Sequence, residues 1–207
     1  MFVKICGLRT QEHVQAAVDA GADAVGFVFA ESVRKVDPAH AATLCTKVPD
    51  TIKKVAVMLH PSNAEWQAVL EEFEPDVLQT DAEDFASLDL PATIESWPVF
   101  REGNRVTDTI RPVFREGNTV AGSCFLYEGA RSGAGEIVDW AAAASVAEQG
   151  RMILAGGLGV GNVATAIDTV RPFGVDVSSG VESAPGEKNS GLIREFISAA
   201  KAAGKKV

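Results

Sequence analysis

The chain has 207 residues, of which 46% are hydrophobic and 23% are charged, with 19 glycines. This is the composition of a folded globular protein with many tight turns, and it argues against a disordered chain. The formal net charge of −9 disfavours a surface for nucleic acids or anionic membranes, because both are negatively charged themselves. We therefore expect no nucleic-acid or membrane partner, and local hydrogen-bond donors must hold any anionic substrate.

The cysteines and the start of the chain do not indicate a secreted or membrane protein. Cys6, Cys45 and Cys124 lie far apart, without the spacing of a disulfide framework or a zinc site. The start, Met1–Lys4, lacks a basic region followed by a long apolar stretch, and no segment is long enough to span a bilayer. We expect a cytoplasmic protein with reduced thiols and no metal.

Short apolar runs rich in β-branched residues recur along the chain, and most precede a segment with helical spacing. This alternation is typical of βα units that build a parallel sheet. The expected strands are Phe2–Cys6, Ala24–Phe29, Lys54–Leu59, Val77–Gln79, Pro98–Arg101, Ser123–Glu128, Met152–Ala155 and Val175–Ser178. The expected helices are Thr10–Ala20, Pro38–Lys47, Asn63–Phe73, Trp140–Gln149, Val160–Val170 and Leu192–Ala203. Asp37, Ser62 and Asp139 directly precede three of them, as helix-capping residues do.

Eight βα units in this length predict one α/β domain, a single-domain (β/α)8 barrel over residues 1–207. An open doubly wound sheet is the alternative, but no G-x-G-x-x-G follows the first strand and no acidic residue is placed for a ribose. A barrel carries its site at the carboxyl ends of its strands. Residues at those strand ends should therefore converge.

Cys6 ends the first strand, in the sequence Lys4-Ile5-Cys6-Gly7. Residues two apart in a strand share a face, so Lys4 points the same way, and an ammonium group near a thiol favours the thiolate. Gly7 allows a sharp turn that we expect to leave the sulfur uncovered. A small buried hydrophobe is the alternative role of a lone cysteine, and these residues alone leave both roles open.

Two segments with glycines follow the seventh and eighth strands, where phosphate-binding barrels commonly hold their phosphate. Glycines there let backbone N–H groups approach an anion closely, and a short helix start can add its own N–H groups. Either segment alone could simply end a strand. Together they predict a phosphate site that includes Gly156, Gly157, Ser178, Ser179 and Gly180.

Three further features follow strands. Glu128 ends the sixth strand, where a carboxyl group could protonate a leaving oxygen if burial raises its pKa, although such a glutamate is more often a solvated rim residue. The glycine loop Arg131–Gly135 after it could cover the site or add N–H donors, or be only a surface loop. Arg34, after the second strand, suits a carboxylate or phosphate, with a surface arginine as the alternative. The histidines show no pairing with a Ser or Cys nucleophile, so a hydrolase triad is poorly supported.

Seven residues, Pro-Val-Phe-Arg-Glu-Gly-Asn, occur twice in the fifth βα unit, at Pro98–Asn104 and Pro112–Asn118. A local duplication or coincidence explains them equally well. Two copies do not make a repeat architecture, and we assign them no chemistry.

In order and over nearly the whole chain, these motifs resemble one family, the phosphoribosylanthranilate isomerases of tryptophan biosynthesis. The matching segments are Lys-Ile-Cys-Gly at 4–7, Gly-Phe-Val-Phe at 26–29 with Ser32 and Arg34, Leu78-Gln79, Gly133 and Gly135 with Asp139-Trp140, Leu-Ala-Gly-Gly-Leu at 154–158 with Asn162-Val163, and Gly-Val-Asp-Val-Ser-Ser-Gly-Val-Glu at 174–182 with Gly186 and Lys188. The resemblance implies a (β/α)8 barrel that carries out an Amadori rearrangement of N-(5-phosphoribosyl)anthranilate without metal or cofactor.

The resemblance also implies roles for single residues. Cys6 would be the general base, and Arg34 would hold the anthranilate carboxylate. Asp176 would lie near the sugar hydroxyls. The phosphate would bind at the two segments after the last strands, with Gly135 as a further donor. We expect a small phosphorylated substrate as the partner, and a monomer or homodimer.

The chain departs from the family at two strand ends. The family usually continues Leu-Gln with Leu-His-Gly after the fourth strand, whereas this chain reads Leu78-Gln79-Thr80-Asp81-Ala82, so we expect a rebuilt loop. The family's general acid is an aspartate at the end of the sixth strand, and counting back from Gly133, Gly135 and Asp139-Trp140 places Glu128 there.

Two other functions stay open. A related isomerase of the histidine pathway, or a barrel serving both pathways, would share the phosphate loops, but those relatives use an aspartate at the end of the first strand, so Cys6 counts against them. A phosphate-binding barrel without activity is the other, because Glu128 replaces the family's acid.

Overall fold

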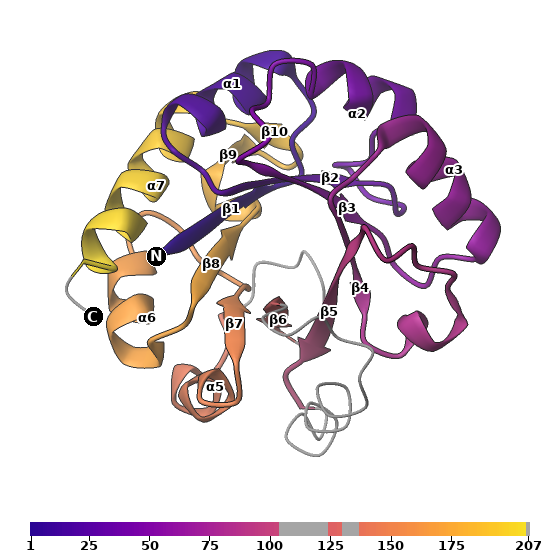
Figure 1. Ribbon diagram of the computed structural model, residues 1–207. Helices are drawn as coiled ribbons and strands as arrows, with labels where there is room; N and C mark the ends of the chain where they lie inside the picture. The colour runs from indigo at the N-terminus through magenta and orange to yellow at the C-terminus, as the bar shows by residue number, and fades with distance from the viewer. Residues whose placement is uncertain (104–123, 130–136, 206–207) are drawn as a thin grey trace.

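The structure, a computed structural model, describes residues 1–103, 124–129 and 137–205. Eight parallel strands close into a barrel in chain order, with the first strand paired to the eighth (Figure 1). The strands are β1 Phe2–Cys6, β2 Ala24–Val28, β3 Lys53–Val57, β4 Val77–Asp81, β5 Glu95–Arg101, β6 Cys124–Glu128, β7 Arg151–Leu154 and β8 Gly174–Val177. The closed ring confirms the predicted (β/α)8 barrel and excludes the open doubly wound sheet.

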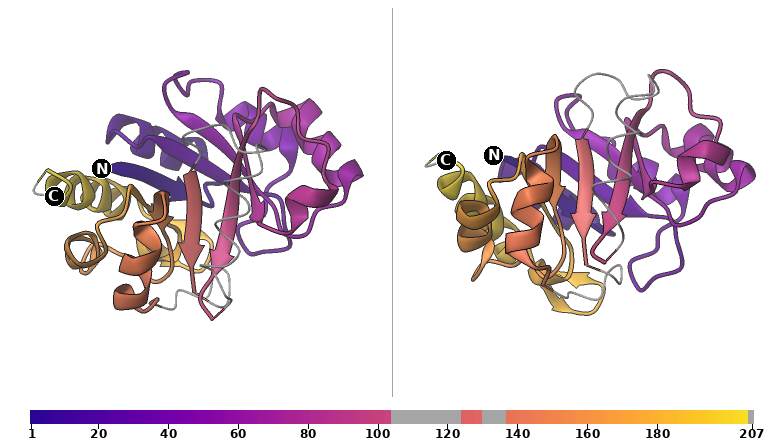
Figure 2. Two further views of the ribbon diagram at one scale, coloured as in Figure 1. Left: turned by 60° about the horizontal axis from the view of Figure 1, so that its bottom comes forward. Right: turned by 90° about the horizontal axis from the view of Figure 1, so that it is seen from below.

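Helices lie along the outside of much of the strand ring, as the two further views in Figure 2 show. Within the described residues they are α1 Gln11–Asp19, α2 Pro38–Leu44, α3 Asn63–Phe73, α5 Trp140–Ala147, α6 Val163–Val170 and α7 Ser190–Ala203, with 3-10 helices η1 Asp84–Ser87 and η2 Ser179–Val181. Helix α7 packs against both α6 and α1, so the last helix joins the first around the barrel.

The three predicted helix caps are confirmed. Asp37 accepts a hydrogen bond from the backbone N–H of His40 and precedes a proline in the first turn. Ser62 and Glu65 form a capping box at α3, which spans the predicted residues. Asp139 accepts from two backbone N–H groups in the first turn of α5.

Some bounds differ from the prediction. Strand β4 continues to Asp81, and β5 begins at Glu95. Helix α6 begins only at Val163, because the Asn162 side chain first closes a turn by accepting from Gly159 N at 2.8 Å. A short hairpin after β8, β9 Glu182–Ala184 and β10 Glu187–Lys188, has no counterpart among the predicted elements.

The strands separate two apolar layers, because their side chains alternate between the barrel interior and the helices. Val55, Trp97 and Leu126 belong to the interior layer. Tyr127 belongs to the outer layer beneath the helices. Alternation along β6 therefore directs Glu128 to the interior side.

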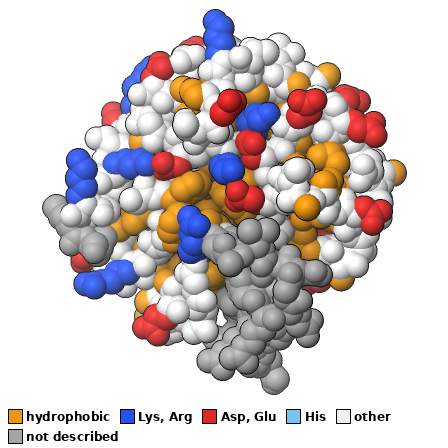
Figure 3. All heavy atoms as spheres, in the orientation of Figure 1, with side chains coloured by type: hydrophobic (Ala, Val, Ile, Leu, Met, Phe, Trp, Pro, Cys, Tyr) orange, Lys and Arg blue, Asp and Glu red, His pale blue; other side chains and the backbone are white. Residues whose placement is uncertain are grey.

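On the face of the molecule drawn in Figure 3, hydrophobic side chains gather near the middle, and charged side chains of both signs surround them. No helix within residues 1–103, 124–129 and 137–205 is long and apolar enough to cross a membrane. Of the duplicated heptapeptide, Pro98–Arg101 ends β5, whereas Asn104 and the second copy lie outside the described residues.

Candidate active site

A buried ion pair lies inside the barrel between the first and last strands. The Lys4 side chain is 0% exposed, and its Nζ lies 2.9 Å from Asp176 Oδ1, where β1 and β8 pair. Gly26 of β2 leaves room for it, since a Cβ there would lie 3.1 Å from Lys4 Cε. Burial lowers the pKa of Lys4, but Asp176 and Cys6 together outweigh burial and raise the pKa overall.

Cys6 lies beside this pair at the carboxyl end of β1 and is buried. Burial raises the pKa of the Cys6 thiol above its usual range; Lys4 lowers it, as expected, but does not outweigh burial. Gly7 does turn the chain, with φ of +75°. The expectation that this turn leaves the sulfur uncovered is wrong, because Cys6 packs within the barrel. Its resting form is the neutral thiol.

A second charged group joins the ends of β2 and β8. The carboxylate of Glu182 accepts from Arg34 Nε at 2.7 Å and Nη2 at 2.9 Å, and from Lys188 Nζ at 2.7 Å. Burial raises the pKa of Glu182, but these donors outweigh it and lower the pKa to about 2. The Arg34 guanidinium is therefore fixed by Glu182, and its Nη1 makes no hydrogen bond within the described residues.

A cavity of about 310 Å³ lies between the loops that follow β7 and β8, lined by Gly157, Leu158, Gly159, Gly161, Asn162, Ser179 and Gly180. The two loops touch through their backbones: a Cβ on Gly180 would lie 1.9 Å from Leu158 O, so only glycine fits there. Small residues and backbone thus form this cavity.

Three of the residues predicted to bind phosphate line this cavity, namely Gly157, Ser179 and Gly180. Gly156 and Ser178 adjoin it in the chain without lining it. The Ser178 side chain instead accepts from Lys188 Nζ at 3.1 Å, toward the group around Glu182. Gly135 lies outside the described residues.

Arg101 connects the ends of β4, β5 and β6. Its Nη2 lies 2.5 Å from Asp81 Oδ1, its Nε lies 3.4 Å from Asp81 Oδ2, and its Nη1 donates to Glu128 Oε1. The side chains of all three residues are less than one-fifth exposed. The predicted Glu128 thus lies in an ion pair with a residue that was not singled out from the sequence. Alternation of Trp97, Val99 and Arg101 along one strand is the signal that could have found it.

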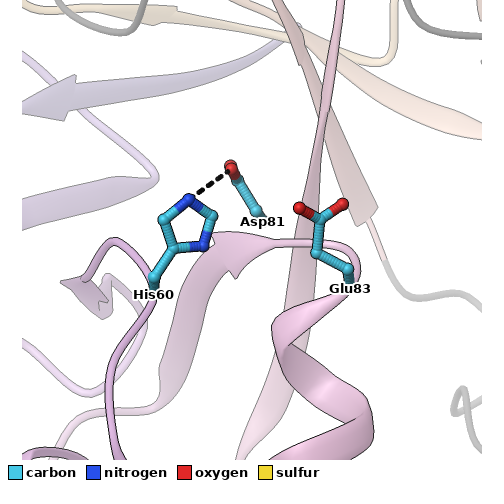
Figure 4. A group of neighbouring side chains, drawn as sticks. All are labelled: His60, Asp81 and Glu83. Atoms are coloured by element: carbon cyan, nitrogen blue, oxygen red, sulfur yellow. Dashed lines mark ion pairs between the residues drawn. The ribbon is translucent and has the colours of Figure 1, made fainter.

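Three further side chains gather beside Asp81, as Figure 4 shows for His60 and Glu83. His60 Nε2 lies 3.6 Å from Asp81 Oδ2, and His60 Nδ1 lies 2.9 Å from Asp84 Oδ1. The hydrogen bond to Asp84 raises the pKa of His60. Because Asp81 already binds Arg101 and His60 already binds Asp84, we assign this cluster to the ion-pair network around Arg101.

The arrangement supplies the parts for proton transfer on a phosphorylated substrate. A thiol, Cys6, and a carboxyl group, Glu128, face inward at the carboxyl ends of two strands of the same barrel. Backbone N–H groups of the two glycine loops can hold an anion near the same end. Such a site can protonate an oxygen of a substrate with its acid and remove a proton from a carbon of the same substrate with its base.

Comparison with known proteins identifies the family of the chain. A family described as N-(5'-phosphoribosyl)anthranilate (PRA) isomerase matches residues 3–199. The N-(5'-phosphoribosyl)anthranilate isomerase of Bordetella petrii is 40% identical over 209 residues, which cover 97% of this chain and 95% of the relative.

Solved structures agree. A phosphoribosyl anthranilate isomerase in complex with reduced 1-(o-carboxyphenylamino)-1-deoxyribulose 5-phosphate matches with a TM-score of 0.77 and 29% identity, over 98% of this chain and 99% of that one. Monomers generated from the dimeric enzyme of Thermotoga maritima match with a TM-score of 0.78 and 28% identity, with the same coverage. By sequence and by structure, this chain belongs to the N-(5'-phosphoribosyl)anthranilate isomerase family.

Proposed function

We propose that the chain converts N-(5-phosphoribosyl)anthranilate to 1-(2-carboxyphenylamino)-1-deoxyribulose 5-phosphate, a step of tryptophan biosynthesis. Family membership supports the reaction. The observation that carries it is the inward-facing pair of Cys6 and Glu128 at the carboxyl ends of β1 and β6, in a barrel whose last two loops form a glycine-lined cavity. Cys6 in place of an aspartate at the end of the first strand argues for this substrate over that of the histidine pathway.

In this mechanism Glu128 is the general acid and donates its proton to the furanose ring oxygen. The C1′–O bond breaks, which leaves a hydroxyl on the sugar and an iminium between C1′ and the anthranilate nitrogen. The Cys6 thiolate then removes the C2′ proton, and the resulting enamine ketonises to the product. Because the thiol rests protonated, it must first lose its proton, and the Lys4 ammonium stabilises the thiolate so formed.

The remaining residues bind the substrate. Arg34 presents its Nη1 edge to the anthranilate carboxylate while Glu182 holds the other edge. Backbone N–H groups around the cavity of Gly157, Ser179 and Gly180 hold the phosphate, with Gly135 as a further donor. Asp176, bonded to Lys4, lies near the sugar hydroxyls.

We also propose that residues 1–207 form one catalytic domain that acts in the cytoplasm as a monomer or homodimer, and that it needs no cofactor. Light scattering of the purified chain measures its oligomeric state. Dialysis against a chelator should leave its turnover unchanged.

Turnover of N-(5-phosphoribosyl)anthranilate tests the reaction and Cys6 together. The wild-type chain should form the product, and Cys6→Ala should lower kcat by about 10²–10⁴-fold with little change in KM, since loss of a general base acts on the transition state. Cys45→Ala, which alters a cysteine at the end of α2, is the control and should keep wild-type kcat.

Three outcomes would contradict this proposal. A wild-type chain without turnover would leave a barrel that only binds phosphate. Faster turnover of the histidine-pathway aminoaldose would reassign the substrate. Wild-type kcat in Cys6→Ala would remove the thiol from the mechanism.

A further inference from the structure

Two carboxylates from different strands share one guanidinium at the carboxyl end of the barrel. Asp81 ends β4, Arg101 ends β5 and Glu128 ends β6. Strand pairing places Arg101 directly beside Glu128, and places Asp81 beside Val99, two residues before Arg101 on the same face. The three side chains are 12–17% exposed, so water screens their charges only weakly.

We propose that Arg101 is a positioning residue for the acid of this reaction: it fixes the Glu128 carboxyl group, and Asp81 neutralises Arg101 so that Glu128 can carry the proton that it donates. This inference rests on the proposed function. It assigns chemistry to two residues, Arg101 and Asp81, that do not need to touch the reacting atoms.

The positioning part follows from side-chain length. Glutamate has one more methylene group than aspartate, hence one more torsion to fix before its carboxyl group can meet a substrate. The contact from Arg101 Nη1 to Glu128 Oε1 restrains that torsion from the neighbouring strand. Displacements of about 1 Å in a catalytic group can cost on the order of 10²-fold in rate, so the restraint is large enough to matter.

The neutralising part follows from charge. An arginine paired with Glu128 alone would favour the carboxylate, which cannot donate a proton. Here Arg101 directs two of its nitrogens, Nη2 and Nε, to Asp81 and one, Nη1, to Glu128. The Asp81–Arg101 pair is neutral as a unit, so its net pull on the Glu128 proton is small.

Other ionisable groups lie further along the same network. His60, after β3, faces both Asp81 and Asp84, and Glu83, after β4, lies within 4.8 Å of His60 and Asp81. Glu102 follows Arg101 and accepts from the backbone N–H of Asp139. The residues at the end of β7, Leu154-Ala155-Gly156, have no ionisable side chain. Within the described residues, Arg101 is thus the cation bonded to both carboxylates.

The test measures kcat, KM and the pH profile of kcat/KM for four variants. Arg101→Gln should lower kcat by about 10²-fold with KM near the wild-type value. It should move the limb of the profile that reports Glu128 to higher pH, because Asp81 then opposes a second negative charge. Asp81→Asn should move that limb to lower pH, because the full charge of Arg101 then acts on Glu128. Arg101→Lys keeps the charge but loses the fork, so it should keep the wild-type pH profile at a reduced kcat.

Glu95→Gln is the matched control, since Glu95 lies at the opposite end of the same strand and pairs with Lys53 at 2.9 Å. It should leave kcat and the pH profile unchanged. Carbon NMR titration of labelled glutamate carboxyl groups should show Glu128 shifting in the same opposite directions in Arg101→Gln and Asp81→Asn, whether or not the variants turn over.

The results separate two failures. If the wild type lacks turnover, the proposed function fails. If the wild type is active but Arg101→Gln keeps its kcat, or if Arg101→Gln and Asp81→Asn move the Glu128 limb in the same direction, the role of Arg101 is wrong and the reaction stands.

Discussion

Three cationic side chains toward the carboxyl end of this barrel are already shared with carboxylates of the protein. Lys4 binds Asp176, and Arg34 binds Glu182 through two nitrogens. Arg101 binds two carboxylates at once. An anionic substrate therefore meets cations that are held in place and partly neutralised. Binding then depends on the edges that remain free and on backbone N–H groups, as a chain with a net charge of −9 requires.

Among these cations, Arg34 has a nitrogen, Nη1, that Glu182 does not bind. Replacing Arg34 with Ala should raise KM at least ten-fold with a smaller effect on kcat, because a clamp on the substrate carboxylate acts in the ground state and the transition state alike. Arg194→Ala, an exposed arginine on α7, should change neither constant. Steady-state kinetics with N-(5-phosphoribosyl)anthranilate measures both. An unchanged KM in Arg34→Ala would limit Arg34 to its bond with Glu182.

The lowered pKa of Glu182 predicts that the stability of the fold depends on pH. Its pKa is about 2 in the folded chain against an ordinary value of 4.5. A lowered pKa stabilises the fold fully above about pH 4.5, and this stabilisation is lost as the pH falls toward 2. Glu182→Gln should therefore be less stable near pH 7, by about 3 kcal/mol or more, because it leaves two buried cations unpaired.

Urea unfolding of wild type and Glu182→Gln at several pH values measures this difference. The gap in the free energy of unfolding should narrow between about pH 4.5 and 2. Glu71→Gln, on the exposed face of α3, should show no gap at any pH. A gap that stayed constant over this range would show that the carboxylate charge does not stabilise the fold.

Among the elements, the short hairpin of β9 and β10 links residues that belong to different loops of the site. It brings Glu182 and Lys188 together. Glu182 binds Arg34 in the loop after β2, and Lys188 donates to Ser178 O directly after β8. The loop before it touches the loop after β7 through the backbone of Gly180. The cavity for an anion is thus formed by contact between two loops, and its shape depends on that contact.

Gly180→Ala tests this contact. A Cβ at that position would lie 1.9 Å from Leu158 O, so the loops must separate. We expect a loss of about 1–3 kcal/mol in the free energy of unfolding and a smaller rise in Tm on addition of inorganic phosphate. Gly161→Ala also lines the cavity, but its Cβ would meet nothing within 4 Å, so its stability should stay at the wild-type value. Equal stability of the two variants would refute the close contact.

The strands could be predicted because each has a local pattern. The hairpin could not, because Glu182–Ala184 and Glu187–Lys188 are short and polar and gain their stability from partners far along the chain, such as Arg34. The late start of α6 has a similar cause: helical spacing begins at Val160, but the side-chain bonds of Asn162 impose a turn first.

For the whole molecule, the closed barrel follows from eight regular βα patterns, and its family from motifs at strand ends. The sequence places Cys6 and Glu128 at strand ends, Asp176 in the eighth strand and Arg34 in the loop after the second, and the structure has them there. The sequence does not show that Cys6 is buried, because its burial depends on how β2 and β8 flank β1. Nor does it show Arg101 between two carboxylates, because the register of three strands decides that contact.

The bond between Lys4 and Asp176 also has a consequence for the order in which the protein is made. The two residues are 172 positions apart, so a ribosome releases Lys4 long before Asp176 exists. A buried ammonium without its carboxylate is costly, so β1 cannot take its final place in the interior until β8 arrives. A nascent chain that holds the first seven strands therefore still lacks the surroundings of Cys6. Closure of the ring by β8 therefore completes the surroundings of Cys6.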